Sequence, residues 1–178
     1  MAGPREIELK LDVPAGQMTR LRQLPFVKRA GPGKRETLRS VYFDTAKHKL
    51  RTRGVSLRIR REGGRSVQTV KQECGDSAGL FMRNEWQREV DGRGPDLAAA
   101  RDTELRPLIG KKLSRKLKPV FVTHIGRRAF SIHRNGSEIE LALDQGKVEA
   151  GQKSSPLHQI SDAERAYAAF ARAKSFWS

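Results

Sequence analysis

The chain has 178 residues, which is enough for one domain with a hydrophobic core of its own. Its outstanding property is charge: the chain has 36 Lys and Arg residues and only 20 Asp and Glu residues, which give a net charge of +16 and a pI near 10.8. This excess predicts a polyanionic partner, whether nucleic acid, a phosphate-rich small molecule or an acidic membrane. Cys74 is the only cysteine, which excludes an intrachain disulfide and a zinc site made of cysteines.

The sequence also limits where the protein works. Its first residues, MAGPREIELK, contain no apolar run of the kind found in a signal peptide. No stretch approaches the roughly 18 apolar residues that a membrane-spanning helix needs. We therefore expect a cytoplasmic protein, and the lack of repeats or linkers predicts a single domain over residues 1–178.

Alternation of charged and apolar side chains predicts the strands of the first half. In Glu6-Ile7-Glu8-Leu9-Lys10 the charged residues share one face of a strand and the apolar residues share the other. A helical spacing of apolar residues and glycine-rich breaks supply the connections. The predicted strands are 5–13, 38–43, 55–61, 66–72 and 80–90, with a helix at 15–24, a basic connection at 46–53, a hairpin turn at Gly63-Gly64 and a loop at 75–79.

The second half is predicted to contain helical pieces at 96–118, followed by more strands. One or two strands fall in 120–133, another in 137–143, and a short segment lies at 147–150 between two glycines. Ser161 followed by Glu164 resembles a capping box, which predicts a final helix from Ser161 to about Lys174.

The predicted strands share an ionic face that carries acids and bases together. In an ordinary antiparallel sheet the polar face meets water, and a solvated two-layer α+β sheet is the plainer interpretation. Dense residues of both signs instead favour a barrel with a polar interior and an apolar exterior under helices. About eight strands leave an interior suited to side chains or one small ligand.

A series of motifs in a fixed order resembles the CYTH domains, the triphosphate tunnel metalloenzyme family, and within it the inorganic triphosphatase branch. Glu6-Ile7-Glu8-Leu9-Lys10 is similar to the family's opening E-x-E-x-K. The other matching segments are Tyr42-Phe43-Asp44-Thr45, Gly54 to Arg60, Thr69-Val70-Lys71, Gly79 to Trp86, Arg127 after Thr123, and Ile139 to Gly151.

This resemblance implies an α+β fold, an antiparallel eight-stranded β-barrel tunnel with a polar lumen and helices packed outside. It implies hydrolysis of a triphosphate-containing small molecule, with cationic side chains holding the phosphates, and arginine suits this task because its planar fork makes two parallel hydrogen bonds. The phosphate-binding residues that it implies are Lys10, Arg58, Arg60, Lys71, Arg83 and Arg127.

The resemblance also implies Mg²⁺ or Mn²⁺ as cofactor, because these hard cations prefer carboxylate oxygens and bridge phosphates. Glu6, Glu8 and Lys10 are the expected catalytic residues. The expected metal ligands are Glu6, Glu8, Glu85, Glu140 and Asp144.

One segment departs from the family pattern. The family's last strand carries a second acidic pair, whereas Gln152 to Ile160, QKSSPLHQI, has no carboxylate. We therefore expect this strand to be altered or missing, which leaves closure of the barrel and full metal ligation open.

Two alternatives to a metal-dependent triphosphatase remain at this point. One is a catalytically impaired module of the same fold that binds triphosphate or other polyanions. The other is a nucleic-acid-binding domain, which ranks last because an aromatic content of 6% offers few stacking platforms. The histidines, which show no paired metal spacing, are His48, His124, His133 and His158.

Overall fold

The structure is a computed structural model, and it describes residues 5–62, 64–77, 80–91, 94–98, 100, 103, 106, 113, 115–134 and 137–164. For the strand residues 5–8, 62, 73–77, 80–83, 134, 137 and 162–164, the description covers the backbone position and not the side chain.

Eight strands and a few short helices make up this part of the chain. The strands are β1 (Arg5–Asp12), β2 (Lys34–Asp44), β3 (Val55–Glu62), β4 (Arg65–Ser77), β5 (Leu80–Val90), β6 (Lys118–Arg134), β7 (Ser137–Ala150) and β8 (Lys153–Glu164). The helices are the 3₁₀ turn η1 (Ala15–Gln17), α1 (Met18–Arg22), α2 (Pro25–Arg29) and the 3₁₀ turn η2 (Arg51–Arg53).

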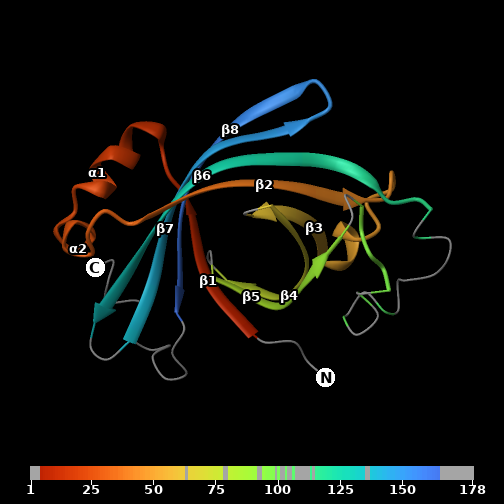
Figure 1. The fold of residues 1–178 in the computed structure, drawn as a ribbon, viewed down its shortest axis with the longest axis horizontal. Helices are drawn as coiled ribbons and strands as arrows, with labels where there is room; N and C mark the ends of the chain where they lie inside the picture. Colours follow the sequence, from red (N-terminus) through yellow and green to blue (C-terminus); the bar gives the residue numbers. More distant parts are fainter. Residues whose placement is uncertain are drawn as a thin grey trace.

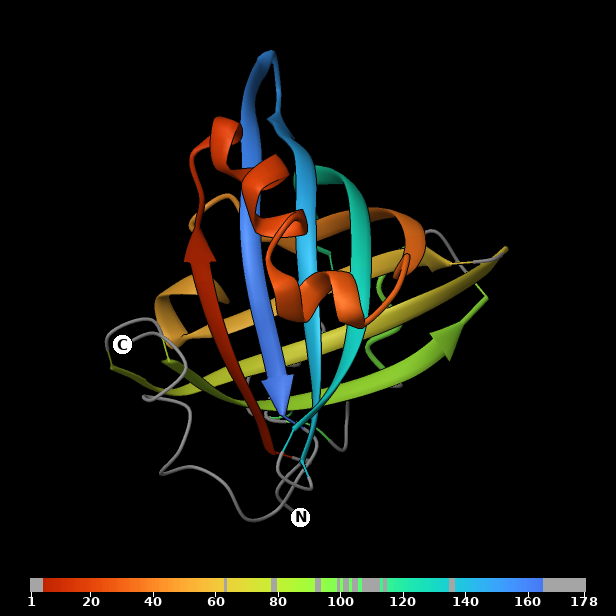
Figure 2. The same ribbon diagram turned by 90° about the vertical axis from the view of Figure 1, so that its left-hand side faces the viewer.

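The strands form a closed antiparallel barrel in the order β1-β5-β4-β3-β2-β6-β7-β8 (Figure 1). Strand β1 closes it, because it pairs with β5 along one edge and with β8 along the other. The long strands β2 and β6 arch over β3, β4 and β5, while α1 and α2 lie on the outside beside β6, β7 and β8 (Figures 1 and 2).

The strand register separates an inner from an outer face around the whole barrel. Residues opposite each other in an antiparallel pair share a face, so the register can be followed from strand to strand. Glu8 pairs with Ala163, Ala163 with Glu140, and the charged positions that the family resemblance singles out on the other strands join the same face. The intervening apolar residues lie on the opposite, outer face.

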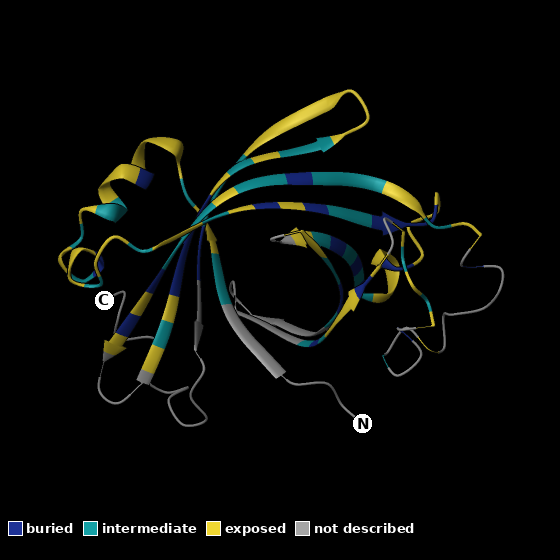
Figure 3. Ribbon diagram, in the orientation of Figure 1, coloured by how far each residue is buried: buried dark blue, intermediate teal, exposed yellow. Residues whose placement is uncertain are grey.

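Two apolar clusters cover the outer face. One is centred on Leu50, Leu57, Ile59 and Val70, with Ala100 and Leu113 packed onto it. The other joins Met18 of α1 and Val27 of α2 to residues of β6, β7 and β8: Phe130, Ile132, Leu141, Leu143 and Ile160. Buried and exposed positions follow one another along β2, whereas β6 is mostly half-buried (Figure 3). The predicted barrel, polar inside and apolar under its helices, is thus confirmed.

The predicted elements of the first half are largely confirmed. Strands β1 to β5 fall where alternation places them, and η1 with α1 occupies the predicted helix at 15–24. Strand β4 continues to Ser77, so the predicted loop at 75–79 is wrong over its first residues. Most of the predicted helical pieces at 96–118 lie outside the described residues.

The second half contains the larger corrections. Residues 120–133, for which one or two strands are predicted, belong to the single strand β6. The predicted separate segment at 147–150 is wrong, because these residues are the end of β7. The last strand is present, because β8 occupies Lys153–Glu164. The predicted helix start at Ser161 is therefore wrong, and its continuation to Lys174 lies outside the described residues.

The strand β7 passes through Gly146, which the sequence pattern treats as a break. A Cβ atom at this position would lie 1.9 Å from the backbone oxygen of His124. Gly146 therefore serves a close approach of β6 and β7 rather than the end of a strand.

No helix within the described residues is long and apolar enough to cross a membrane.

Candidate functional site

The barrel brings the sequence-predicted site residues to its inner face. The strand register places every site residue named in the sequence analysis at a position on the inner face. For Glu6, Glu8 and Arg83 the structure gives the strand position alone. The inner-face residues are Glu6, Glu8 and Lys10 of β1, Arg58 and Arg60 of β3, Lys71 of β4, Arg83 and Glu85 of β5, Arg127 of β6, and Glu140 and Asp144 of β7.

Lys71 and Glu85 form an ion pair deep in this face. They are opposite one another in the β4–β5 register, and Lys71 Nζ lies 2.5 Å from Glu85 Oε2. The side chains are only 15% and 11% exposed, and Gln87 also donates a hydrogen bond to the Glu85 carboxylate. Lys71 and Gln87 therefore hold the Glu85 carboxylate in the absence of any ligand.

Arg127 and Asp144 form a second pair, between β6 and β7. Both contacts are 2.8 Å long, from Arg127 Nε to Asp144 Oδ1 and from Arg127 Nη2 to Asp144 Oδ2. This two-bond geometry is the strong form of an arginine–carboxylate contact. Asp144 is 5% exposed at its side chain, so the pair fixes the direction of the Arg127 guanidinium.

Arg58 lies between Thr69 of β4 and Tyr42 of β2 in the register. Its Nε atom is buried and has no hydrogen-bond partner within the described part of the chain. A buried donor without an acceptor costs free energy, and a bound anion would supply the missing acceptor. Arg58 is thus the inner-face cation most clearly prepared for a ligand.

The inner face also holds residues that sequence analysis did not single out. The rings of Tyr42 and Phe121 stack with centroids 4.3 Å apart and planes 17° apart. Buried hydroxyl groups accompany them at Ser40, Thr69, Thr123 and Ser161. Because alternate residues of a strand share one face, these residues could have been assigned to the inner face, but only once the pairing of β2 with β6 was known.

Carboxylates suited to a metal ion are sparse among the described side chains. No group of three or more His, Cys, Asp or Glu residues is close enough there to hold one. The inner positions at the end of β8 are Ser161 and Ala163, opposite Lys10 and Glu8 of β1. Asp162 and Glu164 fall on the outer face, beside positions such as Leu9 and Leu141.

The comparisons with known proteins agree with this geometry. The model of the CYTH domain family matches residues 4–164. A curated inorganic triphosphatase from Haemophilus influenzae is 32% identical over 124 residues, which are 69% of this chain and 34% of that protein. The chain therefore spans about a third of the length of this relative.

Solved structures share the fold at lower identity. A Hippeastrum protein with a dominant triphosphatase activity has a TM-score of 0.64 at 19% identity, covering 97% of this chain and 84% of that one. A Bacillus halodurans protein, provisionally described as an adenylate cyclase, has a TM-score of 0.61 at 20% identity, covering 93% and 83%.

Proposed function

Because the chain belongs to the CYTH domain family, we propose that it hydrolyses inorganic triphosphate, or another triphosphate, inside the barrel with the help of a divalent metal ion. The observation that carries this proposal is the cationic inner face of a closed barrel. The relationship to an inorganic triphosphatase supports the substrate class.

In this proposal the cations neutralise the phosphate chain. Lys10 of β1, Arg58 and Arg60 of β3 and Arg83 of β5 occupy inner positions. The ion pairs with Glu85 and Asp144 already hold the side chains of Lys71 and Arg127 in place. Binding of a ligand to these two cations would therefore cost little side-chain entropy. Fixed positive charges of this kind stabilise the transition state of phosphoryl transfer, where charge spreads over the phosphate oxygens.

The residues present fit a metal site that has few fixed carboxylate ligands before the phosphate binds. Glu6 and Glu8 occupy inner positions two residues apart on β1, and Glu140 lies across β8 from Glu8. Mg²⁺ commonly needs one or two carboxylates, with waters and phosphate oxygens completing its shell. Glu6 and Glu8 would hold Mg²⁺ or Mn²⁺ with Glu140 nearby, whereas Glu85 and Asp144 would first have to leave their cations. The metal would supply charge to the phosphate oxygens and activate water.

A second candidate function is binding of triphosphate without efficient turnover. Its supporting observation is the inner edge of β8, where Ser161 and Ala163 stand in place of carboxylates. Such a protein would keep the cations of the inner face and bind the anion, but would hold the metal too weakly for hydrolysis.

Phosphate release from tripolyphosphate, ATP and thiamine triphosphate, with and without Mg²⁺ or Mn²⁺, tests both candidates. Metal-dependent release from tripolyphosphate supports the hydrolase. Binding without release under any of these conditions supports the second candidate, and neither binding nor release contradicts both.

Arg58→Ala should weaken tripolyphosphate binding by about 1.5–3 kcal/mol, the usual scale of a hydrogen bond to a charged group. The measurement is calorimetric titration of the folded variant. Arg61→Ala is the matched control, because Arg61 is exposed and lies on the outer face of the same strand. An unchanged dissociation constant for Arg58→Ala would argue against the inner-face site.

A further inference from the structure

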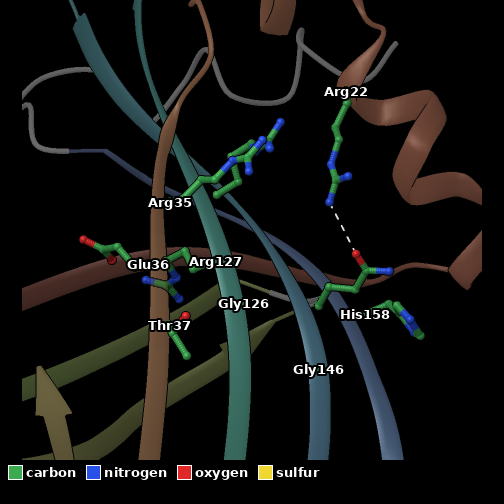
Figure 4. A pocket seen from close by; sticks show the side chains of 10 residues that line it. Arg22, Arg35, Glu36, Thr37, Gly126, Arg127, Gly146 and His158 are labelled. Carbon is green, nitrogen blue, oxygen red and sulfur yellow. Dashed lines mark hydrogen bonds between the residues drawn. The ribbon is translucent and has the colours of Figure 1, made fainter.

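A second concentration of positive charge lies outside the barrel, between α1 and the strands β2, β6 and β7. A pocket of about 590 Å³ opens there. Arg22 reaches into it from α1 and Arg35 from β2, while Glu36 lies on the opposite side of β2 (Figure 4). Its lining residues are Arg22, Arg35, Glu36, Thr37, Gly126, Arg127, Arg128, Gln145, Gly146 and His158.

Two of these arginines oppose each other directly. Arg35 of β2 pairs with Arg128 of β6 in the register, on the outer face. Like charges directly opposite in a sheet destabilise it. Partial burial, and then the charges of Arg35 and Arg22, lower the pKa of the Arg128 guanidinium. Arg35 and Arg22 therefore both lie close enough to Arg128 for their charges to act on its guanidinium.

No carboxylate among the described residues neutralises this group. Neither Arg35 nor Arg128 has an ion pair there, and the carboxylate of Glu36 is 2.6 Å from Lys34 Nζ instead. Arg22 donates a hydrogen bond of 3.3 Å from Nη2 to Gln145 Oε1, and its buried Nε lacks a partner in the described structure. The pocket thus contains a cationic group whose hydrogen-bonding capacity is unfilled.

The pocket also has the space and the neutral donors that an anion needs. Gly126 forms part of its floor without a side chain, and a Cβ atom there would meet nothing closer than the Gln145 oxygen at 3.6 Å. Thr37 and His158 flank this floor on β2 and β8. Guanidinium forks together with hydroxyl and imidazole groups are suited to the tetrahedral oxygens of phosphate.

We propose that Arg22, Arg35 and Arg128 form a second anion site, on the outer wall of the barrel, which binds a small phosphate-bearing anion. It is separate from the inner face, because Arg35 and Arg128 alternate with Glu36 and Arg127 and lie on the other side of the sheet. The proposal does not depend on hydrolysis inside the barrel.

Calorimetry with tripolyphosphate tests the number of sites. Wild type should show two binding events at low salt, of which Arg35→Gln/Arg128→Gln loses one and Arg58→Ala weakens the other. Orthophosphate titrated into Arg58→Ala should report the outer site, and its affinity should fall by about tenfold or more in Arg58→Ala/Arg35→Gln/Arg128→Gln. The control for lost charge is Arg20→Gln/Arg51→Gln, since both residues are exposed and neither lines the pocket.

Thermal unfolding gives a second readout with a distinctive sign. In phosphate-free buffer, Arg35→Gln/Arg128→Gln should melt at a higher temperature than wild type, because it removes the repulsion. Orthophosphate should then raise the melting temperature of wild type and of the control more than that of this variant. If the double variant does not fold, Arg22→Gln, whose backbone lies in a helix outside the sheet, replaces it in both measurements.

Several results would overturn the outer site. These are a single binding event in wild type that Arg35→Gln/Arg128→Gln leaves unchanged, retention of both events in this variant, or an equal response of this variant and the control to orthophosphate. A single event that this variant abolishes would support the outer site and contradict the inner one. Binding of wild type, but not of the variant, to nucleic acid or to anionic lipid vesicles without binding of orthophosphate would also overturn it and point to a macromolecular surface.

Discussion

Asp44 holds the connection after β2 through both oxygens of its carboxylate. Oδ1 accepts hydrogen bonds from the backbone N–H groups of Thr45 and Leu50, at 2.6 and 2.9 Å, and Oδ2 accepts one from Arg51 at 3.1 Å. The residue is 5% exposed, so water does not replace these contacts. The Tyr42-Phe43-Asp44-Thr45 motif therefore includes a structural residue that holds the connection from β2 to β3, the strand that carries Arg58.

Asp44→Asn should lower the free energy of unfolding by about 2–3 kcal/mol, because an amide cannot accept at both positions and leaves buried donors unmatched. Urea denaturation measures this. Asp91→Asn, at an exposed turn position, provides the control and should change stability by less than about 0.5 kcal/mol. Equal stability of the two variants would show that the carboxylate of Asp44 is dispensable.

Gly146 gives a second prediction at this scale. Gly146→Ala places a methyl group against the backbone oxygen of His124, and we expect a loss of about 1–3 kcal/mol or more from overpacking. Gly126→Ala is the matched control on the neighbouring strand, where the nearest atom lies at ordinary contact distance. Equilibrium unfolding of both variants checks the difference, and a Gly146→Ala protein as stable as Gly126→Ala would contradict the close approach of β6 and β7.

At the scale of the element, the strands that could be predicted from sequence are those with charged inner positions. Strand β3 is the clearest case, because Arg58 and Arg60 alternate with Leu57 and Ile59. Strand β8 lacks this contrast, since its inner positions carry Gln159, Ser161 and Ala163. Ser161 and Glu164 match a helix cap locally, but pairing with β1 and β7 decides in favour of a strand. Local pattern could not reveal this tertiary contribution.

The composition of β8 leads to a prediction about metal binding. Mn²⁺ should bind weakly to the free protein and more tightly when a non-hydrolysable triphosphate supplies phosphate oxygens. Ala163→Glu, at the inner position between Glu8 and Glu140, should tighten Mn²⁺ binding to the free protein by about tenfold or more, because an added carboxylate raises the ligand charge.

Calorimetric titration of Mn²⁺ measures both effects. Asp162→Asn is the control, since position 162 lies on the outer face and should leave the affinity unchanged. Tight Mn²⁺ binding to the free wild type that persists in Glu6→Gln/Glu8→Gln would show that the metal lies elsewhere. Weaker Mn²⁺ binding by Asp162→Asn than by wild type would contradict the register of β8.

At the scale of the whole molecule, the alternation of charged and apolar residues was compatible with a barrel or with a solvated sheet, and the resemblance to the CYTH domains implied the eight-stranded barrel. The same pattern left the inner ion pairs undetermined: nothing in the sequence shows that Lys71 faces Glu85 or that Arg127 faces Asp144. The outer arginine group was missed for a similar reason. Arg22, Arg35 and Arg128 are far apart in sequence, and only the pairing of β2 with β6 and the position of α1 bring them together.

The net charge of +16 gives the last prediction its direction. Inner positions of β1, β3, β4, β5 and β6 belong to cationic residues, so folding brings like charges together around the interior of the barrel. A bound polyanion relieves this repulsion in the folded state alone, so tripolyphosphate should stabilise the fold by linkage. At a hundredfold excess over its dissociation constant, the melting temperature should rise by about 5–10 °C.

The rise should shrink as salt is added, because exposed charges are screened over about 10 Å at 0.1 M ionic strength. Melting curves with and without tripolyphosphate, at low and high NaCl, measure both effects. Arg58→Ala should reduce the rise more than Arg61→Ala does, since Arg58 lies on the inner face and Arg61 on the outer. A melting temperature that ignores tripolyphosphate at low salt would contradict a ligand-binding barrel, whether catalytic or not.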